Sequence, residues 1–212
     1  IYPVNSSKLS LHRIIKQRVK YELSRAGLKP RDSVLLILTP TPSSLIQLYI
    51  VAPLEKRYDA KISCVYMGQR SLIENHAKKI CNKLEKEPHV HSYVEIYQYA
   101  ASRKNLRTLT PFVADDLALQ AILDALNPPP IHAFLNALTR PIHPLQRITA
   151  NEALEYAIKI DKNARNLPRL LLSAKELELL MEFSKAPPHA ARATHLNLAK
   201  AIGRSLNTKQ HP

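Results

Sequence analysis

The stretch VLLILTPTPSS, from Val34 to Ser44, runs five apolar residues directly into a loop with a proline at every second position. A short continuous apolar run bounded by turn residues predicts a buried β-strand. Ser43 and Ser44 then open an apolar segment, and serine is a preferred residue at the start of a helix. A strand, a tight loop and a helix N-terminus together form the arrangement in which many α/β proteins hold phosphate.

The loop lacks glycine, which such a site ordinarily requires. Glycine permits the close approach and the unusual backbone angles by which successive N–H groups converge on an anion. The chain has three glycines, Gly27, Gly68 and Gly203, and none of them lies in this loop. Pro40 and Pro42 also have no N–H to donate. The sequence therefore predicts the position of a phosphate loop without its chemistry.

The surrounding sequence predicts an α/β fold. Apolar residues recur with helical spacing in residues 8–26, which are also basic, and again over about residues 71–86. The segments AKISCVYM (60–67) and HVHSYVEIYQ (89–98) predict two further strands. Strands separated by helices favour a parallel sheet built of right-handed βαβ units, with helices on its faces.

Helix boundaries are marked by prolines that end helices and by carboxylates or hydroxyls that begin them. The predicted boundaries are Pro53 as the end or kink of a helix over 43–52, Asp115 and Asp116 as the start of a helix ended by Asn127 and three prolines, and TANE (149–152) and SAKE (173–176) as two further starts. A last helix is predicted over about residues 190–206. The predicted division is a basic helix (1–30), an α/β domain with the altered loop (31–148) and a largely helical C-terminal region (149–212).

The chain is strongly basic. Among 212 residues, Lys and Arg number 31 and Asp and Glu 17, which gives a net charge of +14 and a pI near 9.9. This imbalance favours a polyanionic partner, with RNA as the first candidate, and the alternative is a solvated basic surface. No apolar run approaches the roughly 18 residues of a membrane span, so we expect no membrane partner.

Cysteine usage favours a reducing compartment. Cys64 and Cys81 supply neither a disulfide framework nor a zinc site, and two scattered thiols are usual in the cytoplasm. The first twenty residues lack the continuous apolar stretch of a signal peptide. We therefore expect a cytoplasmic protein.

The strand, the TPTPSS loop and the following helix resemble the PP-loop ATP pyrophosphatase superfamily, whose active members carry Ser-Gly-Gly-x-Asp-Ser at this loop. Within that superfamily, the sequence resembles the second subunit of the cytosolic tRNA 2-thiolation complex, which has Ser-Gly-Gly-Pro-Ser-Ser there. Pro42, Ser43 and Ser44 match that pattern, whereas Thr39, Pro40 and Thr41 replace its Ser-Gly-Gly. Three further segments are similar to that family: DDLALQAIL (115–123), RPIHPLQRITANEALEYA (140–157) and ELLMEFSKAPPHAARATHLNLAKAIGRSL (178–206).

The resemblance implies a degenerate PP-loop sheet and a non-catalytic subunit. Such a subunit would bind tRNA and a catalytic PP-loop thiolase during 2-thiolation of the wobble uridine at position 34, and a ubiquitin-like sulfur carrier would act through the complex. The paired active-site cysteines of catalytic thiolases are absent, so we expect no cofactor. Two alternatives remain open. One is an atypical ATP-dependent tRNA-modifying enzyme that uses Asp115, Asp116 and Ser43 or Ser44, and the other is a general RNA-binding scaffold.

Two groups of residues are candidates for function. The vestigial nucleotide site comprises Thr39, Pro40, Thr41, Pro42, Ser43, Ser44, Asp115 and Asp116, and for its serines and acids we expect helix-capping and first-turn roles. The RNA-binding candidates are Arg103, Lys104, Arg107, Arg140, Arg147, Arg192, Lys200 and Arg204. We expect the first three near the carboxyl ends of the strands, where α/β folds bind ligands.

Two weaker patterns are not assigned a function. His89 and His91 are an isolated His-x-His pair with no neighbouring Cys or acid, so no metal site is predicted. Tyr93, Tyr97 and Tyr99 are expected to pack on a strand and not to stack on bases.

Overall fold

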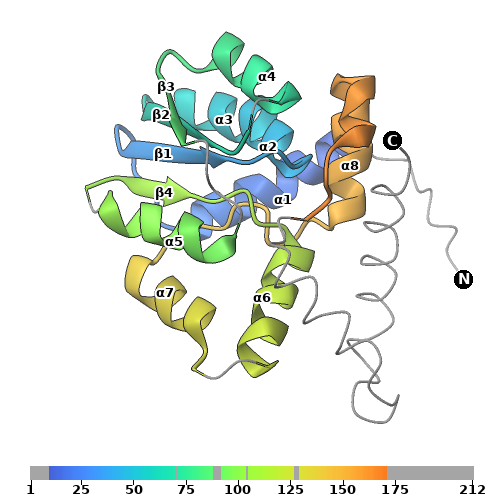
Figure 1. Ribbon diagram of the computed structural model, residues 1–212. Helices are drawn as coiled ribbons and strands as arrows, with labels where there is room; N and C mark the ends of the chain where they lie inside the picture. Colours follow the sequence, from blue (N-terminus) through green and yellow to red (C-terminus); the bar gives the residue numbers. More distant parts are fainter. Residues whose placement is uncertain (1–9, 70, 88–91, 104, 127–128, 171–212) are drawn as a thin grey trace, which may run out of the picture.

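The computed structural model describes residues 10–170, apart from residues 70, 88–91, 104 and 127–128. Its centre is a four-stranded parallel sheet with helices on both sides (Figure 1). The strands are β1 (Ser33–Leu38), β2 (Lys61–Met67), β3 (Leu84–Glu87) and β4 (Arg107–Leu109), in the spatial order β3-β2-β1-β4. The predicted α/β class with a parallel sheet is confirmed.

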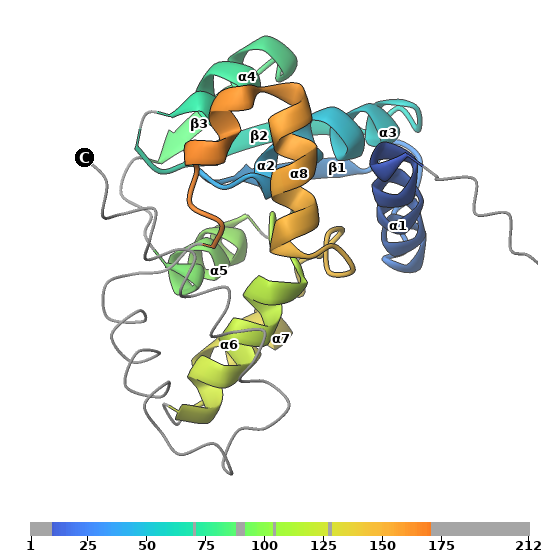
Figure 2. The ribbon, with the colours of Figure 1, turned by 90° about the vertical axis from the view of Figure 1, so that its right-hand side faces the viewer.

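The helices cover both faces of this sheet and one of its ends. They are α1 (Leu11–Arg25), α2 (Ser43–Ile46), α3 (Ala52–Lys56), α4 (Leu72–Ile80), α5 (Tyr93–Ser102), α6 (Ala114–Leu126), α7 (Ile131–Thr139) and α8 (Ala150–Ile160), with a π-helical turn η1 (Gln47–Val51) and a 3-10 turn η2 (Lys162–Asn166). α1 and α3 lie on one side of the sheet and α5 on the other (Figure 2). α8 stands at the end of the sheet to which the strands point, and it packs against α2.

β1 forms the middle of the core, as the opening stretch predicted. Residues 34–38 are each 0 to 2% exposed, because β1 has a strand on either side and helices above and below.

The chain after α7 extends the sheet beyond β4 by a single bridge. There Ile142 N donates to Thr108 O at 2.8 Å and Thr110 N donates to Ile142 O at 3.0 Å.

Pro53 does not end the helical segment that follows the loop. The segment continues from α2 through η1 into α3, where Pro53 occupies the second position. A proline inside a helix lacks a donor and clashes with the carbonyl four residues earlier. The π-helical turn immediately before it widens the hydrogen-bond ladder at that point, so the segment passes the proline.

The strand predicted over residues 89–98 is wrong. Residues 93–102 form α5, which begins at a capping box made by Ser92 and Glu95, and residues 88–91 lie outside the described part of the chain. Tyr93, Ile96, Tyr97 and Ala100 are buried, which is a helical spacing. The third strand instead lies at 84–87, because the helix predicted over 71–86 ends at Ile80 and Leu84 pairs with Cys64.

The two cysteines are not separate thiols. Cys64 in β2 and Cys81 at the C-terminus of α4 form a disulfide, with their Cα atoms 6.2 Å apart. The sequence prediction failed because the two cysteines are 17 residues apart in sequence. The chain between them completes β2 and forms α4, and the end of α4 comes back beside β2. Free thiols therefore no longer support a reducing compartment, and a cytoplasmic location remains a prediction.

Three predictions on the C-terminal half have different outcomes. The capping box of TANE is confirmed, because Thr149 and Glu152 bond reciprocally at the start of α8. The helix that begins beside Asp115 and Asp116 is confirmed as α6. The SAKE start and the helix over 190–206 lie outside the described residues.

None of the described helices combines the length and the apolar character needed to cross a membrane.

Candidate functional sites

The loop after β1 is closed by its own hydroxyl groups. Thr39 N donates to Ser44 Oγ at 2.8 Å, which ties the end of the strand to the first turn of α2. The Thr41 hydroxyl shares hydrogen bonds with those of Thr39 at 2.8 Å and Ser43 at 2.9 Å. All four side chains are at most 4% exposed. The hydroxyls of the loop are thus already bonded to one another and to the backbone of Thr39.

Pro40, in this loop, packs closely against Gly68. A Cβ atom placed on Gly68, at the end of β2, would lie 3.0 Å from Pro40 Cδ, so the two residues are in close contact. Gly68 has φ +142°, which side chains rarely adopt, and its N–H donates to Glu87 O at 2.9 Å. Gly68 therefore allows the close contact with Pro40, which a side chain at this position would disturb.

The two aspartates at the start of α6 hold other elements in place. Asp115 Oδ2 accepts from Ala150 N at 2.6 Å, so it caps the first turn of α8. Asp116 is buried, and its carboxylate accepts from Tyr93 Oη at 2.7 Å and Val113 N at 2.9 Å. These bonds support the first-turn and capping roles expected for both residues, and they compete with any metal for the same oxygens.

The segment DDLALQAIL also aligns α6 with α5. Tyr93 donates to Asp116, and one turn later Tyr97 Oη donates to Gln120 Oε1 at 2.7 Å. Both pairs are spaced by four residues on their own helices, so they fix the register of the two helices. Burial raises the pKa of Tyr97 well above its usual range, and Asp124 and Asp116 add to the shift, which keeps the phenol protonated as a donor. The tyrosines therefore pack, as expected, but on a helix.

No group of three or more His, Cys, Asp or Glu side chains in the described part of the chain is arranged to hold a metal ion. His89 and His91 fall among the residues that the structure does not describe.

The expected position of Arg103 and Arg107 is wrong. Arg107 begins β4 and pairs with Val34, the second residue of β1, so these residues lie at the amino ends of the strands. The error follows from the misplaced third strand, which moved the connection to the opposite end of the sheet. Arg103 Nη2 donates to Glu85 Oε2 at 2.7 Å, and Arg107 Nη2 donates to Ala26 O at 2.7 Å.

Arg147 is held by an acid that the sequence pattern did not single out. Glu22 of α1 is 3% exposed, and its carboxylate pairs with Arg147 and accepts from Gln146. The Arg147 guanidinium also lies over the Tyr21 ring, 4.4 Å from its centroid. These contacts connect α1 to the segment before α8, and they hold the guanidinium of Arg147 through its Nε atom and its face.

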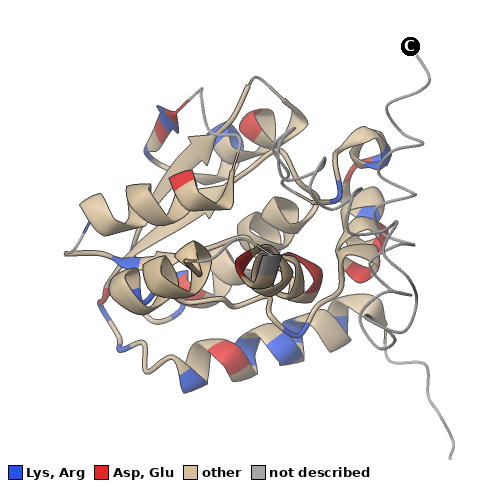
Figure 3. Ribbon diagram, turned by 60° about the horizontal axis from the view of Figure 1, so that its bottom comes forward, with Lys and Arg blue, Asp and Glu red and all other residues tan. Residues whose placement is uncertain are grey.

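A basic groove brings together two predicted candidates and one that was missed. Arg107 and Arg140 line an open groove of about 310 Å³ with Arg25 from the last turn of α1. The other lining residues are Glu22, Ala26, Pro141, Ile142, His143 and Gln146. Glu22 is the single acid of α1, whose remaining charges are all basic (Figure 3). Arg25 lay within the predicted basic helix, but the sequence did not place it with Arg107 and Arg140, because it precedes them by 82 and 115 residues.

Arg140 differs from its neighbours in backbone conformation. It ends α7 in the left-handed region, with φ 45° and ψ 51°, and it is exposed. No hydrogen bond or ion pair joins its guanidinium to another described residue. Lys104, Arg192, Lys200 and Arg204, the other predicted candidates, lie outside the described residues.

Comparisons with known proteins identify the fold. No protein-family model matches the chain, and no curated protein does either. Among solved structures, it is similar to the U34-tRNA thiolase NcsA from Methanococcus maripaludis, a structure with its 4Fe–4S cluster, at a TM-score of 0.56 and 12% identity over 95% of this chain and 81% of that chain. An NH3-dependent NAD synthetase from Campylobacter jejuni, in complex with nitrate, has a TM-score of 0.44 and 12% identity over 96% and 98% of the two chains. The fold is therefore of the PP-loop type, adenine nucleotide alpha hydrolase-like, as predicted.

Proposed function

We propose that this protein is a non-catalytic PP-loop subunit that binds tRNA and a catalytic PP-loop thiolase in the 2-thiolation of the wobble uridine at position 34. The closed loop after β1 is the observation that carries this proposal. Pro40 packs on Gly68, and the hydroxyls of Thr41 and its neighbours bond to one another. In a catalytic relative, backbone N–H groups at this position would face phosphate.

The assignment to tRNA rests on the resemblance of the sequence to the second subunit of the thiolation complex. A U34-tRNA thiolase among the structures of similar fold supports the same pathway. The catalytic subunit and a ubiquitin-like sulfur carrier are partners that the resemblance implies. In this proposal the thiolation chemistry lies in the partner, and this chain contributes surface to the binding of tRNA.

The basic groove is the proposed contact with the tRNA backbone. Arg25, Arg107 and Arg140 come from three separate elements and meet around one opening, where phosphate groups can approach several guanidinium groups. A left-handed backbone costs a residue other than glycine about 1 kcal/mol, and helices commonly end in glycine at such a position. An arginine at φ 45° supports a role for the charge of Arg140 that outweighs this cost.

A measurement of Mg²⁺·ATP binding distinguishes this proposal from the alternative hypothesis that the protein is an ATP-dependent enzyme. We expect calorimetry on the isolated chain to detect no binding, because Asp115 and Asp116 are bonded to Ala150, Tyr93 and Val113. The double variant Pro40→Gly, Thr41→Gly should not restore binding, since glycine returns backbone freedom without releasing these acids. A dissociation constant on the order of micromolar for either protein would support the enzyme reading.

Binding of tRNA tests the groove. We expect the double variant Arg25→Gln, Arg140→Gly to weaken tRNA binding and to flatten the dependence of log affinity on log salt by about 1.4 to 1.8, since each of the two lost phosphate contacts removes roughly 0.7 to 0.9. Arg107 is left unchanged because it caps α1 through Ala26 O. Fluorescence anisotropy across a salt series, on the chain alone and with its partner, measures both quantities.

A matched control removes two exposed cations elsewhere. Lys79→Gln, Lys159→Gln takes the same charge from the last turns of α4 and α8 and should leave the salt slope near that of the wild type. Equal effects of the two double variants would mean that net charge alone attracts the RNA. An unchanged slope in the Arg25, Arg140 variant would remove the groove from the proposal.

A cellular measurement tests the pathway itself. Deletion of the gene should lower 2-thiouridine at position 34 of cytosolic tRNA, as measured by mass spectrometry of digested tRNA. The wild-type chain and the Lys79, Lys159 variant should restore the modification, whereas the Arg25, Arg140 variant should restore it incompletely. Normal 2-thiouridine in the deletion strain would contradict the proposed function.

A further inference from the structure

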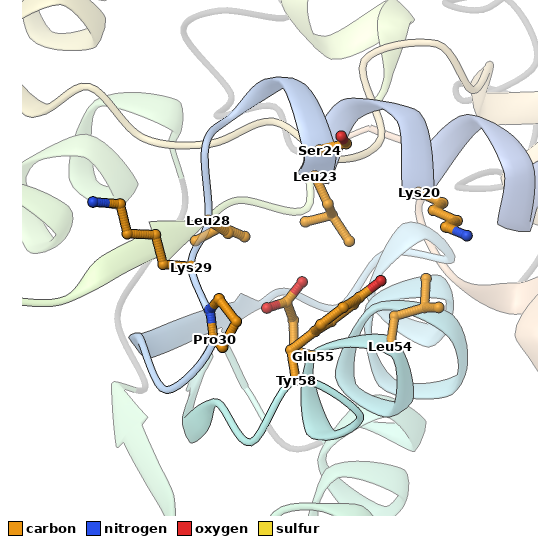
Figure 4. A pocket seen from close by; sticks show the side chains of 9 residues that line it. All are labelled: Lys20, Leu23, Ser24, Leu28, Lys29, Pro30, Leu54, Glu55 and Tyr58. Carbon is orange, nitrogen blue, oxygen red and sulfur yellow. The ribbon is translucent and has the colours of Figure 1, made fainter.

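A partly open cavity lies between α1, the segment leading into β1, and α3. Its volume is about 250 Å³, and its lining residues are Lys20, Leu23, Ser24, Leu28, Lys29, Pro30, Leu54, Glu55 and Tyr58 (Figure 4). Because Pro30 precedes β1, the cavity is at the amino ends of the strands, away from the loop after β1. It is separate from the basic groove, with which it shares no lining residue.

The walls of this cavity are mainly apolar. Leu23 from α1 faces the side chains of α3 across the opening, Leu28 lies beside it, and the ring of Tyr58 runs along the opposite wall (Figure 4). Leu23 is 6% and Leu54 7% exposed, so both are fixed parts of the core. A ligand would therefore meet a mainly hydrophobic slot.

One buried carboxylate points into this slot. Glu55 is 3% exposed, and its carboxyl group lies at the centre of the cavity in Figure 4. No hydrogen bond or ion pair joins that carboxyl to any described residue. The backbone is fixed independently, because Glu55 O accepts from Tyr58 N at 3.0 Å and from Ala60 N at 3.3 Å. The side chain is thus positioned by the end of α3 and not by a partner of its own.

Other buried acids in the described chain have the partners that Glu55 lacks. Glu22 pairs with Arg147, and Glu74, at 2% exposure, pairs with Lys78 at 2.9 Å and Lys86 at 3.2 Å. Removal of a carboxylate from water is costly unless a cation or hydrogen-bond donors replace the water. Burial, with a contribution from Asp32, accordingly raises the pKa of Glu55.

The nearby lysines do not neutralise this carboxyl. In Figure 4 the side chains of Lys20 and Lys29 extend away from the cavity on opposite sides, and both residues are exposed. They flank the opening and would repel a ligand with several positive charges. The arrangement favours a single cationic head on a compact apolar body.

We propose that this cavity binds a small monocation whose planar amidinium or guanidinium head pairs with Glu55 and whose apolar body packs between Leu23, Leu28 and Leu54. A planar fork of N–H donors matches both oxygens of a carboxylate, and such bidentate pairs are among the strongest hydrogen-bonded contacts. Binding at this cavity is independent of the proposed tRNA function, because it involves neither the loop after β1 nor the basic groove.

Benzamidine is the probe, with neutral benzamide as its isosteric control. Calorimetry on the full chain should detect benzamidine binding, and benzamide should bind at least about tenfold more weakly, since a charge-assisted contact is lost. Glu55→Gln should weaken benzamidine binding by about tenfold or more. Asp59→Asn removes an exposed acid four residues further on, at a left-handed position that asparagine tolerates, and should leave binding unchanged.

Thermal unfolding separates a ligand site from a purely structural acid. Without ligand, Glu55→Gln should melt at the wild-type temperature or above it, because the variant no longer buries an unpaired acid. Benzamidine should raise the melting temperature of the wild type and not that of the variant. Each of three results would overturn the proposal: no benzamidine binding to the wild type at millimolar concentration, equal binding of benzamide, or equal binding to Glu55→Gln.

Discussion

His143 lies in the segment 140–157, which resembles the thiolation-complex subunit, and its contacts in the structure stabilise the fold. Its ring stacks on Phe112, with centroids 5.8 Å apart, and its Nδ1 and Nε2 atoms lie 2.6 Å from Thr110 Oγ1 and 3.0 Å from Asn136 Oδ1. These partners suit a neutral ring that accepts from the threonine and donates to the asparagine amide oxygen. Burial of the ring disfavours a second ring proton.

The pH dependence of stability should therefore report on His143. Burial lowers its pKa from 6.5 to about 4, so the unfolded chain binds the proton first as pH falls. Its contribution is complete above pH 6.5, decreases as pH falls toward 4, and amounts to at most about 3 kcal/mol. Denaturant unfolding of His143→Gln should show a smaller loss of stability between pH 6.5 and 4 than the wild type. Parallel pH profiles for the two proteins would contradict the assignment.

Single residues were predictable from sequence where their role depends on near neighbours. The position of the loop after β1 followed from five apolar residues and two serines. The helix-capping role expected for Ser43 and Ser44 is wrong, because Pro42 is the N-cap of α2 and no side chain caps its first turn. Ser44 Oγ instead accepts from Thr39 N at the end of the strand. The roles of Arg107 and Glu22 did not follow, because each depends on a residue at least 81 positions away. The Pro40–Gly68 contact was hidden in the same way, since it joins the ends of two different strands.

At the scale of helices, the starts of α7 and α8 each depend on an acid from α6. α7 begins after Pro130, which offers no side-chain hydrogen bond to its first turn. Asp124 of α6 replaces the missing cap: its Oδ1 accepts from His132 N at 2.9 Å and its Oδ2 from Ala133 N at 2.7 Å. Burial opposes ionisation of Asp124, but these N–H groups and the His132 ring bring its pKa below the usual range.

Loss of this cap should destabilise the protein. Asp124→Ala should lower the free energy of unfolding by about 1 to 2 kcal/mol at neutral pH, because two N–H groups of α7 lose their acceptor. The difference should shrink as pH falls below about 4, since a depressed pKa gives stability that is lost on protonation. Urea unfolding at several pH values measures it. Glu155→Ala removes an exposed acid of α8 as the control, and an equal loss there would count against capping.

Helix boundaries were predictable when the signal was local. Thr149 and Glu152 lie three residues apart, and their capping box forms as predicted. The sequence HVHSYVEIYQ was misread as a strand because Val94 and Ile96 alternate with Glu95 and Tyr97. Ser92 and Glu95 nevertheless carry the same capping signal as Thr149 and Glu152. The true third strand has four residues, too few for a periodic pattern to identify it.

At the scale of the whole molecule, one covalent bond and one charged cluster connect distant parts. The ion pairs around Glu22, and the Arg18 to Glu152 pair at 2.7 Å, fasten α1 to the segment that starts α8. The disulfide fastens α4 to β2 on the other half of the sheet. The parallel sheet could be predicted from the alternation of strand and helix patterns in the sequence. The strand order, the disulfide and the ion pairs could not, because they depend on how the βα units pack in space.

The disulfide leads to a test of both fold and compartment. A crosslink that closes a loop of about 17 residues stabilises a folded chain by roughly 3 kcal/mol, chiefly by restricting the unfolded state. Chemical denaturation of Cys64→Ala, Cys81→Ala should therefore show a loss of stability approaching that value. Reduction of the wild type should produce a similar loss once the bond opens, and opening should be slow because Cys64 is 1% exposed.

Thiol labelling decides whether the bond exists in the native protein. A thiol-reactive reagent added to protein unfolded without reductant should label neither cysteine, and both should be labelled after reduction. Protein purified from its own cells, with free thiols trapped at lysis, extends the test to the natural compartment. Two labelled thiols in that protein would restore the sequence-based argument for a reducing compartment, and they would also predict that the double alanine variant is nearly as stable as the wild type.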